Sequence, residues 1–268
     1  MGFADPGFDL VRLRAVFQFN RDRSINLKSR NLTQIRFKRN NATSRRKIAV
    51  HFSIAIGNVN MDRLPLQTPQ FFWSDVGQAQ MWAAQHYFFD RPNTHVTSGG
   101  LGPMGYALPA AIGVQIGKPE EEVWCVTGDG GFQMTLEELS ILVEERLPVK
   151  IALFNNNFLG MVRQWQQLFF DKRYSGVKMW NPDFVKLGEA YSIPSMRVKD
   201  VDDVRRSIDW ARDIDGPAMI EFVVEAEENV FPMVPPGASL HETIESAEDV
   251  APKMQQVAVA AGSDAGGV

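Results

Sequence analysis

Two short apolar runs, each ending in residues too polar for a protein core, place the strongest constraint on the fold of this chain. The chain passes from the run Val123–Thr127 into Gly128-Asp129-Gly130-Gly131, and from the run Val149–Phe154 into Asn155-Asn156-Asn157. Runs of this length and composition are typical of buried strands. The polar residues after them are therefore expected where strands end and loops begin.

A helix is expected between the two runs. Thr135 and Glu138 have the spacing of a capping box at its start. A strand, a helix and a second strand make a crossover unit, whose two parallel strands end at the same edge of a sheet. Asp129 and Asn156 are then near neighbours. Four apolar residues fall on one face of the helix: Leu136, Leu139, Leu142 and Val143.

This edge of the sheet is expected to carry oxygen ligands suited to a hard metal ion. Open α/β sheets bind their ligands outside the carboxyl ends of the strands. A carboxylate from Asp129 and an amide oxygen from Asn156 suit Mg²⁺, which takes its other ligands from water and phosphate. Gly130 and Gly131 allow the backbone to approach a ligand closely, and the following helix directs its N-terminal amides at an anion. The stretch therefore predicts a site for Mg²⁺ and a diphosphate.

Strands and helices alternate through the rest of the chain. A strand, a turn at Asp75–Gly77 and a helix are expected from residue 71, and the polar segment 171–180 is expected to be a loop and a candidate lid. Asn181-Pro182 has the residues of a helix start, with Asn181 as the cap. The alternation predicts the α/β class, with a doubly wound parallel sheet and helices on both faces. Further helices are expected at 107–116, 158–170 and 201–211, and further strands at 196–198 and 218–224.

A glycine-rich segment before the first run offers a different interpretation. Gly100, Gly102 and Gly105 spell G-x-G-x-x-G, the fingerprint of dinucleotide-binding sites. That fingerprint needs an apolar strand before it and an acidic residue that ends the second strand. His95-Val96-Thr97 is a weak strand candidate, and Glu120–Glu122 precede the next strand instead of ending it. A nicotinamide site is therefore not favoured.

Several segments resemble one enzyme family. Gly128-Asp129-Gly130, followed about twenty-five residues later by Asn155-Asn156, is similar to the thiamine diphosphate motif that begins GDG and ends NN. The segments GDGGFQMTLEEL, NNNFLGMVRQWQQLF, DFVKLGEAY and ENVFPMVPPGASL resemble the catalytic large subunit of acetohydroxyacid synthase, also called acetolactate synthase. The resemblance covers roughly Ser74 to Glu245. It implies a thiamine diphosphate-binding domain over residues 71–245, after a basic extension or linker over 1–70 and before a disordered tail over 246–268.

The resemblance also implies roles for individual residues. Mg²⁺ would be held by Asp129, Asn156 and the backbone carbonyl of Phe158. The substrate channel would be lined by Met161, Val162 and Trp165, although their helical spacing is equally that of a core stripe. Ala79 stands where members of the family commonly have histidine, so one phosphate contact is expected to be missing. The cofactor would be held by Val76, Gly77, Gln78, Gly102, Met104, Gly130 and Gly131, with Met104 beneath its two rings.

The implied reaction condenses pyruvate with a second 2-keto acid, with loss of CO₂, in branched-chain amino acid biosynthesis. In the family, the glutamate that activates the cofactor lies on a pyrimidine-binding domain, and a middle domain carries most of the FAD site. Nothing before Ser74 resembles either domain, so we expect no catalytic residue here and little activity from the chain alone. Expected partners are a second copy or a complementary chain with the pyrimidine-binding domain, and a regulatory small subunit.

Two other functions stay open. One is another thiamine diphosphate-dependent carboligase or decarboxylase, such as a pyruvate oxidase-like enzyme, which the segments VFPMVPPGA and MVRQWQ argue against. The other is a non-catalytic fragment whose basic N-terminal arm binds a partner or nucleic acid. Residues 1–50 contain twelve Lys and Arg against three Asp and Glu, although the whole chain has a net charge of −4. The arm lacks aromatic-glycine motifs, so nucleic acid is not favoured.

Composition excludes several other classes of protein and site. No run approaches the roughly twenty apolar residues that span a bilayer, so no membrane partner is expected. The single cysteine, Cys125, excludes an internal disulfide and is expected to be a packed thiol. The four histidines show no zinc-ligand spacing. We expect a cytoplasmic protein, or an organellar one if the Arg-rich N-terminus is a transit peptide.

Overall fold

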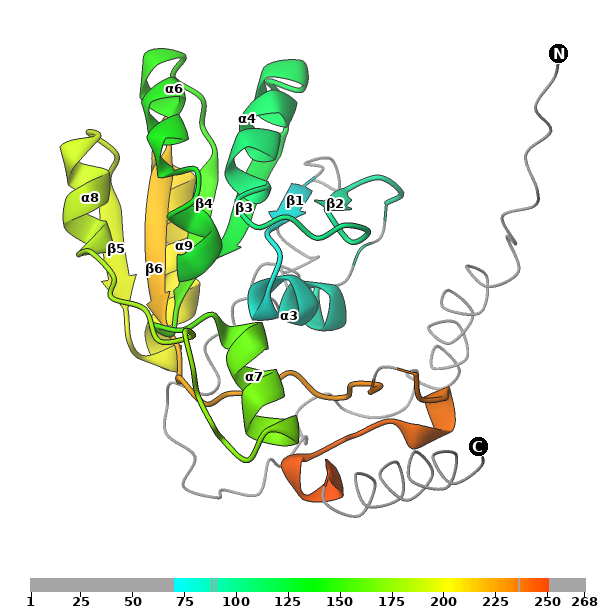
Figure 1. Ribbon diagram of the computed structural model, residues 1–268. Helices are drawn as coiled ribbons and strands as arrows, with labels where there is room; N and C mark the ends of the chain where they lie inside the picture. The colour runs from blue at the N-terminus through cyan, green and yellow to red at the C-terminus, as the bar shows by residue number, and fades with distance from the viewer. Residues whose placement is uncertain (1–69, 88, 90, 236, 251–268) are drawn as a thin grey trace, which may run out of the picture. The chain divides into compact units, whose positions relative to one another are not determined.

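The computed structural model describes residues 70–250, apart from residues 88, 90 and 236. Residues 1–69 of the expected extension and residues 251–268 of the expected tail lie outside the described residues, whereas Gln70 begins the first strand. The described chain forms a six-stranded, all-parallel sheet in the order β2-β1-β3-β4-β6-β5 (Figure 1). The strands are β1 (Gln70–Ser74), β2 (His95–Thr97), β3 (Glu122–Gly128), β4 (Lys150–Asn155), β5 (Ser195–Val198) and β6 (Ala218–Val223).

Helices cover both faces of this sheet, which confirms the expected doubly wound α/β fold. One face packs against α3 (Gln78–His86) and α9 (Val204–Asp213), and the other packs against α4 (Ala107–Gly117), α6 (Leu139–Glu144) and α8 (Phe184–Ala190). The remaining elements are α5 (Asp129–Phe132), α7 (Gly160–Phe169), and the 3₁₀ turns η4 (Leu136–Glu138), η5 (Val201–Asp203), η6 (Leu240–Glu242) and η7 (Ala247–Asp249). In Figure 1, α7 lies beyond the carboxyl ends of the strands.

The central strands are apolar on both sides because both faces of the sheet are covered. On β3, Trp124 and Val126 belong to the core beneath α3 and α9, whereas Val123 and Cys125 belong to the core beneath α4, α6 and α8. All six residues of β4 are buried. Burial also raises the pKa of the Cys125 thiol well above its ordinary value, with a smaller contribution from Asp75. Cys125 is therefore the packed thiol that was expected.

The strand order reverses direction between β1 and β3. From β1 the chain passes through α3 to β2 on one side, and from β2 it passes through α4 to β3 on the other. The two crossover helices lie on opposite faces of the sheet. A crevice therefore opens between the carboxyl ends of β1 and β3, which is where open α/β sheets bind ligands.

The expected capping box at Thr135 is wrong. The segment begins as the 3₁₀ turn η4 and becomes α-helical only at Leu139, and the Thr135 side chain makes no cap bond. The Thr135 hydroxyl instead donates to the Gly105 carbonyl at 3.1 Å. This bond joins the first turn of the segment to the glycine-rich loop. The Thr135 hydroxyl therefore bonds to a distant residue instead of capping its own helix. The expected apolar face is present, with Leu139 and Leu142 fully buried.

The expected start of α8 is also wrong. Asp183 is the cap, and its side chain accepts a bond from the Lys186 backbone N–H at 3.5 Å. Asn181 lies two residues earlier, and its amide is engaged at the end of the sheet. Both residue types cap helices well, so the sequence alone did not separate them.

The chain after β6 is irregular, as expected for its prolines. The Phe231-Pro232 peptide bond is cis, and Met233 and Ile244 form an isolated antiparallel bridge. Residues 246–250 of the expected tail include the turn η7, and Val250 is buried in a small cluster with Met233 and Ile244. Within the described chain, no helix is long and apolar enough to cross a membrane.

Candidate functional site

Strands β3 and β4 bring the two polar segments together. Gly128 is paired with Phe154 in the parallel register, so Asp129 and Asn155 lie side by side where the two strands end. The Asn157 backbone N–H donates to Asp129 Oδ2 at 2.8 Å. Asn157 has a φ of 59°, in the left-handed region that asparagine enters more readily than most residues. The expected proximity of the Asp129 and Asn156 segments is confirmed.

Asp129 is a buried carboxylate whose two oxygens are engaged unequally. Its Oδ2 accepts bonds from Asn157 N–H at 2.8 Å and from Asn181 Nδ2 at 2.6 Å, whereas Oδ1 accepts one from Gly130 N–H at 3.1 Å. Burial raises the pKa of Asp129 to about 6, although the bonds from Asn181, Asn157 and Gly130 act in the opposite direction. The hydrogen bonds thus only partly offset the cost of burying the negative charge, and a bound cation would favour the ionised form.

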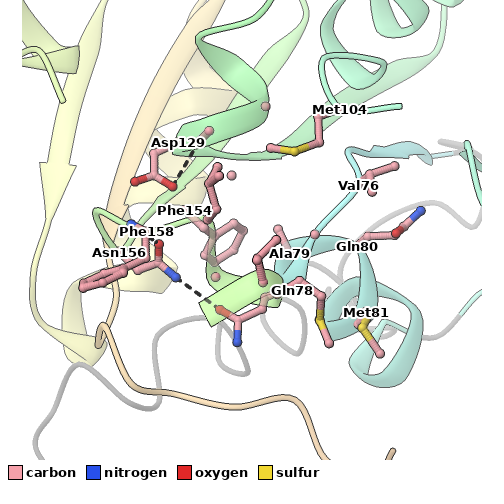
Figure 2. A pocket seen from close by; sticks show the side chains of 18 of the residues that line it. Val76, Gln78, Ala79, Gln80, Met81, Met104, Asp129, Phe154, Asn156 and Phe158 are labelled. Atoms are coloured by element: carbon pink, nitrogen blue, oxygen red, sulfur yellow. Dashed lines mark hydrogen bonds between the residues drawn. The ribbon is translucent and has the colours of Figure 1, made fainter. Parts of the chain in front are cut away.

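Asn156 is held from two sides. Its Oδ1 accepts a bond from the Phe158 backbone N–H at 3.0 Å, and its Nδ2 donates to Gln78 Oε1 at 3.2 Å. Figure 2 shows Asp129, Asn156 and Phe158 together on one side of a cavity, with Val76 on the opposite side. Asp129 at the end of β3, and Asn156 and Phe158 after β4, therefore line the same side of the cavity.

The Gln78 side chain is fully engaged within the protein. Its Nε2 donates to Gln164 Oε1 at 3.0 Å and to the Glu228 carbonyl at 2.8 Å, while its Oε1 accepts from Asn156. A Cβ at Gly160 would overlap Gln78 Oε1, so a larger residue at this position would displace the Gln78 amide. Gln78 thus connects the candidate metal residue Asn156 to α7 and to the segment after β6.

Gly130 lies at the floor of the cavity among apolar side chains. A Cβ at this position would lie 2.8 Å from Leu159 Cδ2, 3.1 Å from Met104 Cε and 3.3 Å from Met179 Sδ. Met104 comes from the glycine-rich loop, and Met179 comes from the connection between α7 and α8. The cavity is therefore apolar beside the candidate metal residues, as a site for an aromatic ring system requires.

Asp75 ties the glycine-rich loop to the end of β1. Its carboxylate accepts bonds from the backbone N–H groups of Gly105 and Tyr106, both at 3.1 Å, and from Thr127 Oγ1 at 3.1 Å. Gly131 packs against it so closely that a Cβ there would overlap Asp75 Oδ2. Gly131 is therefore required by packing, whereas the sequence suggested ligand approach as its purpose.

A cavity of about 310 Å³ brings together nearly all of the expected site residues. All seven expected cofactor residues line it: Val76, Gly77, Gln78, Gly102, Met104, Gly130 and Gly131. The three expected metal residues and two of the three channel residues, Met161 and Val162, line it as well. Trp165 is outside the lining and packs against Phe169, with a centroid separation of 5.0 Å. Its channel role stays a prediction.

The residues present fit Mg²⁺ as the metal. Within the described chain, no group of three or more His, Cys, Asp or Glu side chains could hold a metal. A metal at Asp129 would therefore depend on amide and carbonyl oxygens, water and phosphate, which is the coordination that Mg²⁺ favours. Ala79 is 4% exposed and lines the cavity, so no side chain at that position reaches a phosphate.

Sequence reasoning missed two residues of the site, Asp75 and Asn181. Asp75 directly follows β1 as Asp129 follows β3, and this shared position could have identified it. Asn181 could not have been found in this way, because it reaches the site from a loop. Its Nδ2 donates to Asp129 Oδ2, to Asn155 Oδ1 at 2.8 Å and to Asn157 Oδ1 at 3.3 Å.

The family model for "Thiamine pyrophosphate enzyme, C-terminal TPP binding domain" matches residues 75–222, which include these strand ends. The chain belongs to this family. Thiamine pyrophosphate is the same compound as thiamine diphosphate, so the family agrees with the cofactor that the GDG and NN segments implied. The matched residues extend from Asp75 to Phe222 on β6, and thus contain the metal residues and every expected cofactor residue.

Relatives of this thiamine pyrophosphate enzyme domain are acetolactate synthases. The chain is 47% identical over 173 residues to the Escherichia coli K12 acetolactate synthase isozyme 2 large subunit, covering 64% of this chain and 32% of the relative. It is 49% identical over 174 residues to the Corynebacterium glutamicum large subunit, covering 63% and 28%. It is 48% identical over 169 residues to the mitochondrial catalytic subunit of Saccharomyces cerevisiae, covering 63% and 25%. The aligned part is thus about a quarter to a third of each relative.

Proposed function

We propose that this chain is the cofactor-binding part of an acetolactate synthase, which condenses pyruvate with a second 2-keto acid and releases CO₂. One observation carries the proposal. Asp129, Asn156 and Phe158, which carry a carboxylate, an amide and a backbone carbonyl, lie together at one side of a cavity whose other walls carry Met104 and the turn Val76–Gln78. A metal-bound diphosphate at the polar side would place the rest of the cofactor over the apolar floor.

The protein residues would bind and orient. Asp129, Asn156 and the Phe158 carbonyl would hold Mg²⁺, and the backbone around Gly130 would lie against the diphosphate. Met104 would support the cofactor rings. When bound, thiamine diphosphate would supply the chemistry that breaks and forms carbon–carbon bonds at its thiazolium ring, while the protein supplies position and electrostatics.

The group that transfers protons to and from the cofactor would have to come from a second polypeptide. Among the described residues that line the cavity, Asp129 is the only ionisable side chain. A carboxylate committed to a metal cannot also activate the cofactor. We therefore propose that activity requires a second polypeptide surface, from another copy or from a complementary chain, with a regulatory small subunit and FAD as components of the whole assembly.

Binding tests the first part of this proposal. Isothermal titration calorimetry of the purified chain with thiamine diphosphate should show binding that depends on Mg²⁺. Asp129→Ala should abolish it, because this variant removes the only carboxylate among the described residues that line the cavity. The control is Asp209→Ala, which removes a half-exposed carboxylate whose partner Arg205 lies on the same face of α9. Unchanged binding by Asp129→Ala would refute the proposed site.

Turnover tests the second part. The purified chain, supplied with pyruvate, thiamine diphosphate and Mg²⁺, should make no acetolactate. Activity should appear when a protein with the pyrimidine-binding domain of a relative is added. Robust acetolactate formation by the chain alone would contradict the proposal that the proton-transfer group is external.

A further inference from the structure

Asn181 connects the Asp129 carboxylate to a network of polar side chains on the neighbouring strands β4, β6 and β5. It lies on the connection between α7 and α8, and its Nδ2 donates to Asp129 Oδ2 at 2.6 Å and to Asn155 Oδ1 at 2.8 Å. Its Oδ1 accepts a bond from Gln133 Nε2 at 2.9 Å. Every polar atom of this side chain thus has a partner in the site.

Glu221 fixes the orientation of the Asn155 amide. Glu221 lies on β6 and is 2% exposed, and its Oε1 accepts a bond from Asn155 Nδ2 at 2.7 Å. An ionised carboxylate only accepts hydrogen bonds, so the NH₂ group of Asn155 must face it. The oxygen of Asn155 is then directed at Asn181 and at the Asn157 backbone N–H, which donates to it at 3.1 Å.

The orientation of Asn181 follows from that of Asn155. Because an oxygen of Asn155 and a carboxylate oxygen of Asp129 both face Asn181, the group between them must be its NH₂. The oxygen of Asn181 then faces the NH₂ of Gln133, which is a donor. Two buried carboxylates, Glu221 and Asp129, therefore determine the direction of every bond between them.

The same network attaches the loop to the sheet at a second point. Arg197 on β5 donates from Nε to Glu221 Oε2 at 2.6 Å and from its terminal nitrogen to Asp183 Oδ1 at 2.6 Å. Asp183 is the cap of α8 and lies two residues after Asn181. The backbone that carries Asn181 is thus held by Arg197 on one side and by Asn155 on the other.

We infer that Asn181 is a positioning residue that orients Asp129 for Mg²⁺. The bonds from Asn181 and Asn157 occupy Oδ2, which leaves Oδ1, with its single longer bond from Gly130, as the oxygen for the cation. The inference rests on the proposed function, since it needs Mg²⁺ at Asp129. Asn181 acts through Asp129 and contacts neither substrate nor metal.

Asn181→Ala tests the inference. Calorimetric titration of Mg²⁺ in the presence of thiamine diphosphate should give an affinity about 10- to 100-fold weaker than that of the wild type, the usual effect of removing a residue that orients a metal ligand. Mn²⁺ in place of Mg²⁺, with the free ion measured by electron paramagnetic resonance, should show the same loss. Circular dichroism and thermal unfolding will show whether the variant is folded.

Gln166→Ala is the matched control. Gln166 exchanges two bonds of 3.0 Å with the backbone of Ser175, and so it holds the same connection without touching Asp129. This variant should bind Mg²⁺ within about two-fold of the wild type. An equal loss in both variants would overturn the inference, because loosening of the loop would then explain it. A wild-type affinity in Asn181→Ala would overturn it directly.

Glu221→Gln tests the network from a distance. The glutamine oxygen must face the donor Arg197, so its NH₂ faces Asn155 and forces that amide to turn. The turned amide directs its NH₂ at Asn181, which weakens the support of Asp129, and a several-fold loss of Mg²⁺ affinity is expected. Unchanged affinity in a folded variant would overturn the role of Glu221. Failure of the wild type itself to bind the cofactor with Mg²⁺ would instead refute the proposed function.

Discussion

Asp129 is the residue whose ionisation should be most visible in the stability of the metal-free protein. Burial raises its pKa from 3.8 to about 6, so the folded state favours the protonated form. This contribution is fully present below about pH 4 and is lost as the pH rises through about 6. At 1.36 kcal/mol per pKa unit, the loss amounts to about 3 kcal/mol.

Asp129→Asn should remove this pH dependence. Between pH 4 and pH 7, the unfolding free energy of the metal-free wild type should fall relative to that of the variant by up to about 3 kcal/mol. Urea denaturation of both proteins at closely spaced pH values, with a chelator present, measures the difference. Parallel profiles for the two proteins would show that Asp129 titrates normally. Mg²⁺ affinity of the wild type should fall below pH 6, because protons compete with the metal.

Gly131 should be sensitive to a single added methyl group. Its missing Cβ makes room for the buried carboxylate of Asp75, which holds the glycine-rich loop. Gly131→Ala should lower the unfolding free energy by about 1–3 kcal/mol, as overpacking of a core does. In Gly113→Ala, on the exposed side of α4, the new Cβ meets nothing within 4 Å, and the variant should be about 0.5–1 kcal/mol more stable. Equal effects in denaturant titrations would argue against this packing role.

At the scale of elements, the local sequence pattern predicts where strands and apolar helix faces lie, but it does not predict helix starts that depend on tertiary contacts. The strands β3 and β4, and the apolar face of Leu139 and Leu142, follow from runs of apolar residues that any two-sided sheet would bury. The helix starts at Thr135 and Asn181 do not, because both side chains bond to distant residues in place of their own helix. A cap motif predicts a hydrogen bond within the helix. That bond is not formed when the side chain bonds instead to a residue from another part of the fold.

The pairing of α7 with the segment after β6 is another tertiary contact, and Gln164 is at its centre. Its Nε2 donates to the Val230 carbonyl at 2.9 Å, and its Oε1 accepts from the Val230 N–H at 2.8 Å. Gln164 is 0% exposed, so Gln164→Ala would leave these backbone groups buried without a partner. The unfolding free energy should fall by about 1–3 kcal/mol.

Amide hydrogen exchange should locate this effect. The Val230 N–H should exchange faster in Gln164→Ala than in the wild type, since its acceptor is gone. Gln166→Ala, on the same helix, loses only surface bonds to Ser175 and should change stability by less than about 0.5 kcal/mol. Protection of Val230 that is unaffected by Gln164→Ala would contradict the assigned contact.

For the whole described chain, the all-parallel sheet and the location of the site were predictable for one physical reason. A crossover unit leaves the carboxyl ends of its strands at one edge, so Asp129 and Asn156 had to meet there. The positions of Asp75, Gln78 and Asn181 depend on loops and on side chains from four separate segments, for which no periodic signal exists. Of the three, Asp75 alone shares with Asp129 a position directly after a strand, and the contacts of Gln78 and Asn181 emerge only when the hydrogen bonds are followed.

Cofactor binding should stabilise the whole described fold, because the site joins β1, β3, β4 and the loop before α8. A ligand that binds only the folded state adds about 2.7 kcal/mol at a hundred times its dissociation constant. Thiamine diphosphate and Mg²⁺ together should therefore raise the thermal unfolding midpoint in a concentration-dependent way, whereas each alone should have little effect. Thiamine without its diphosphate, added with Mg²⁺, is the control, since it cannot bridge to the metal. An equal shift with thiamine would show that the rings provide the binding energy, which would contradict a site built on a metal-bound diphosphate.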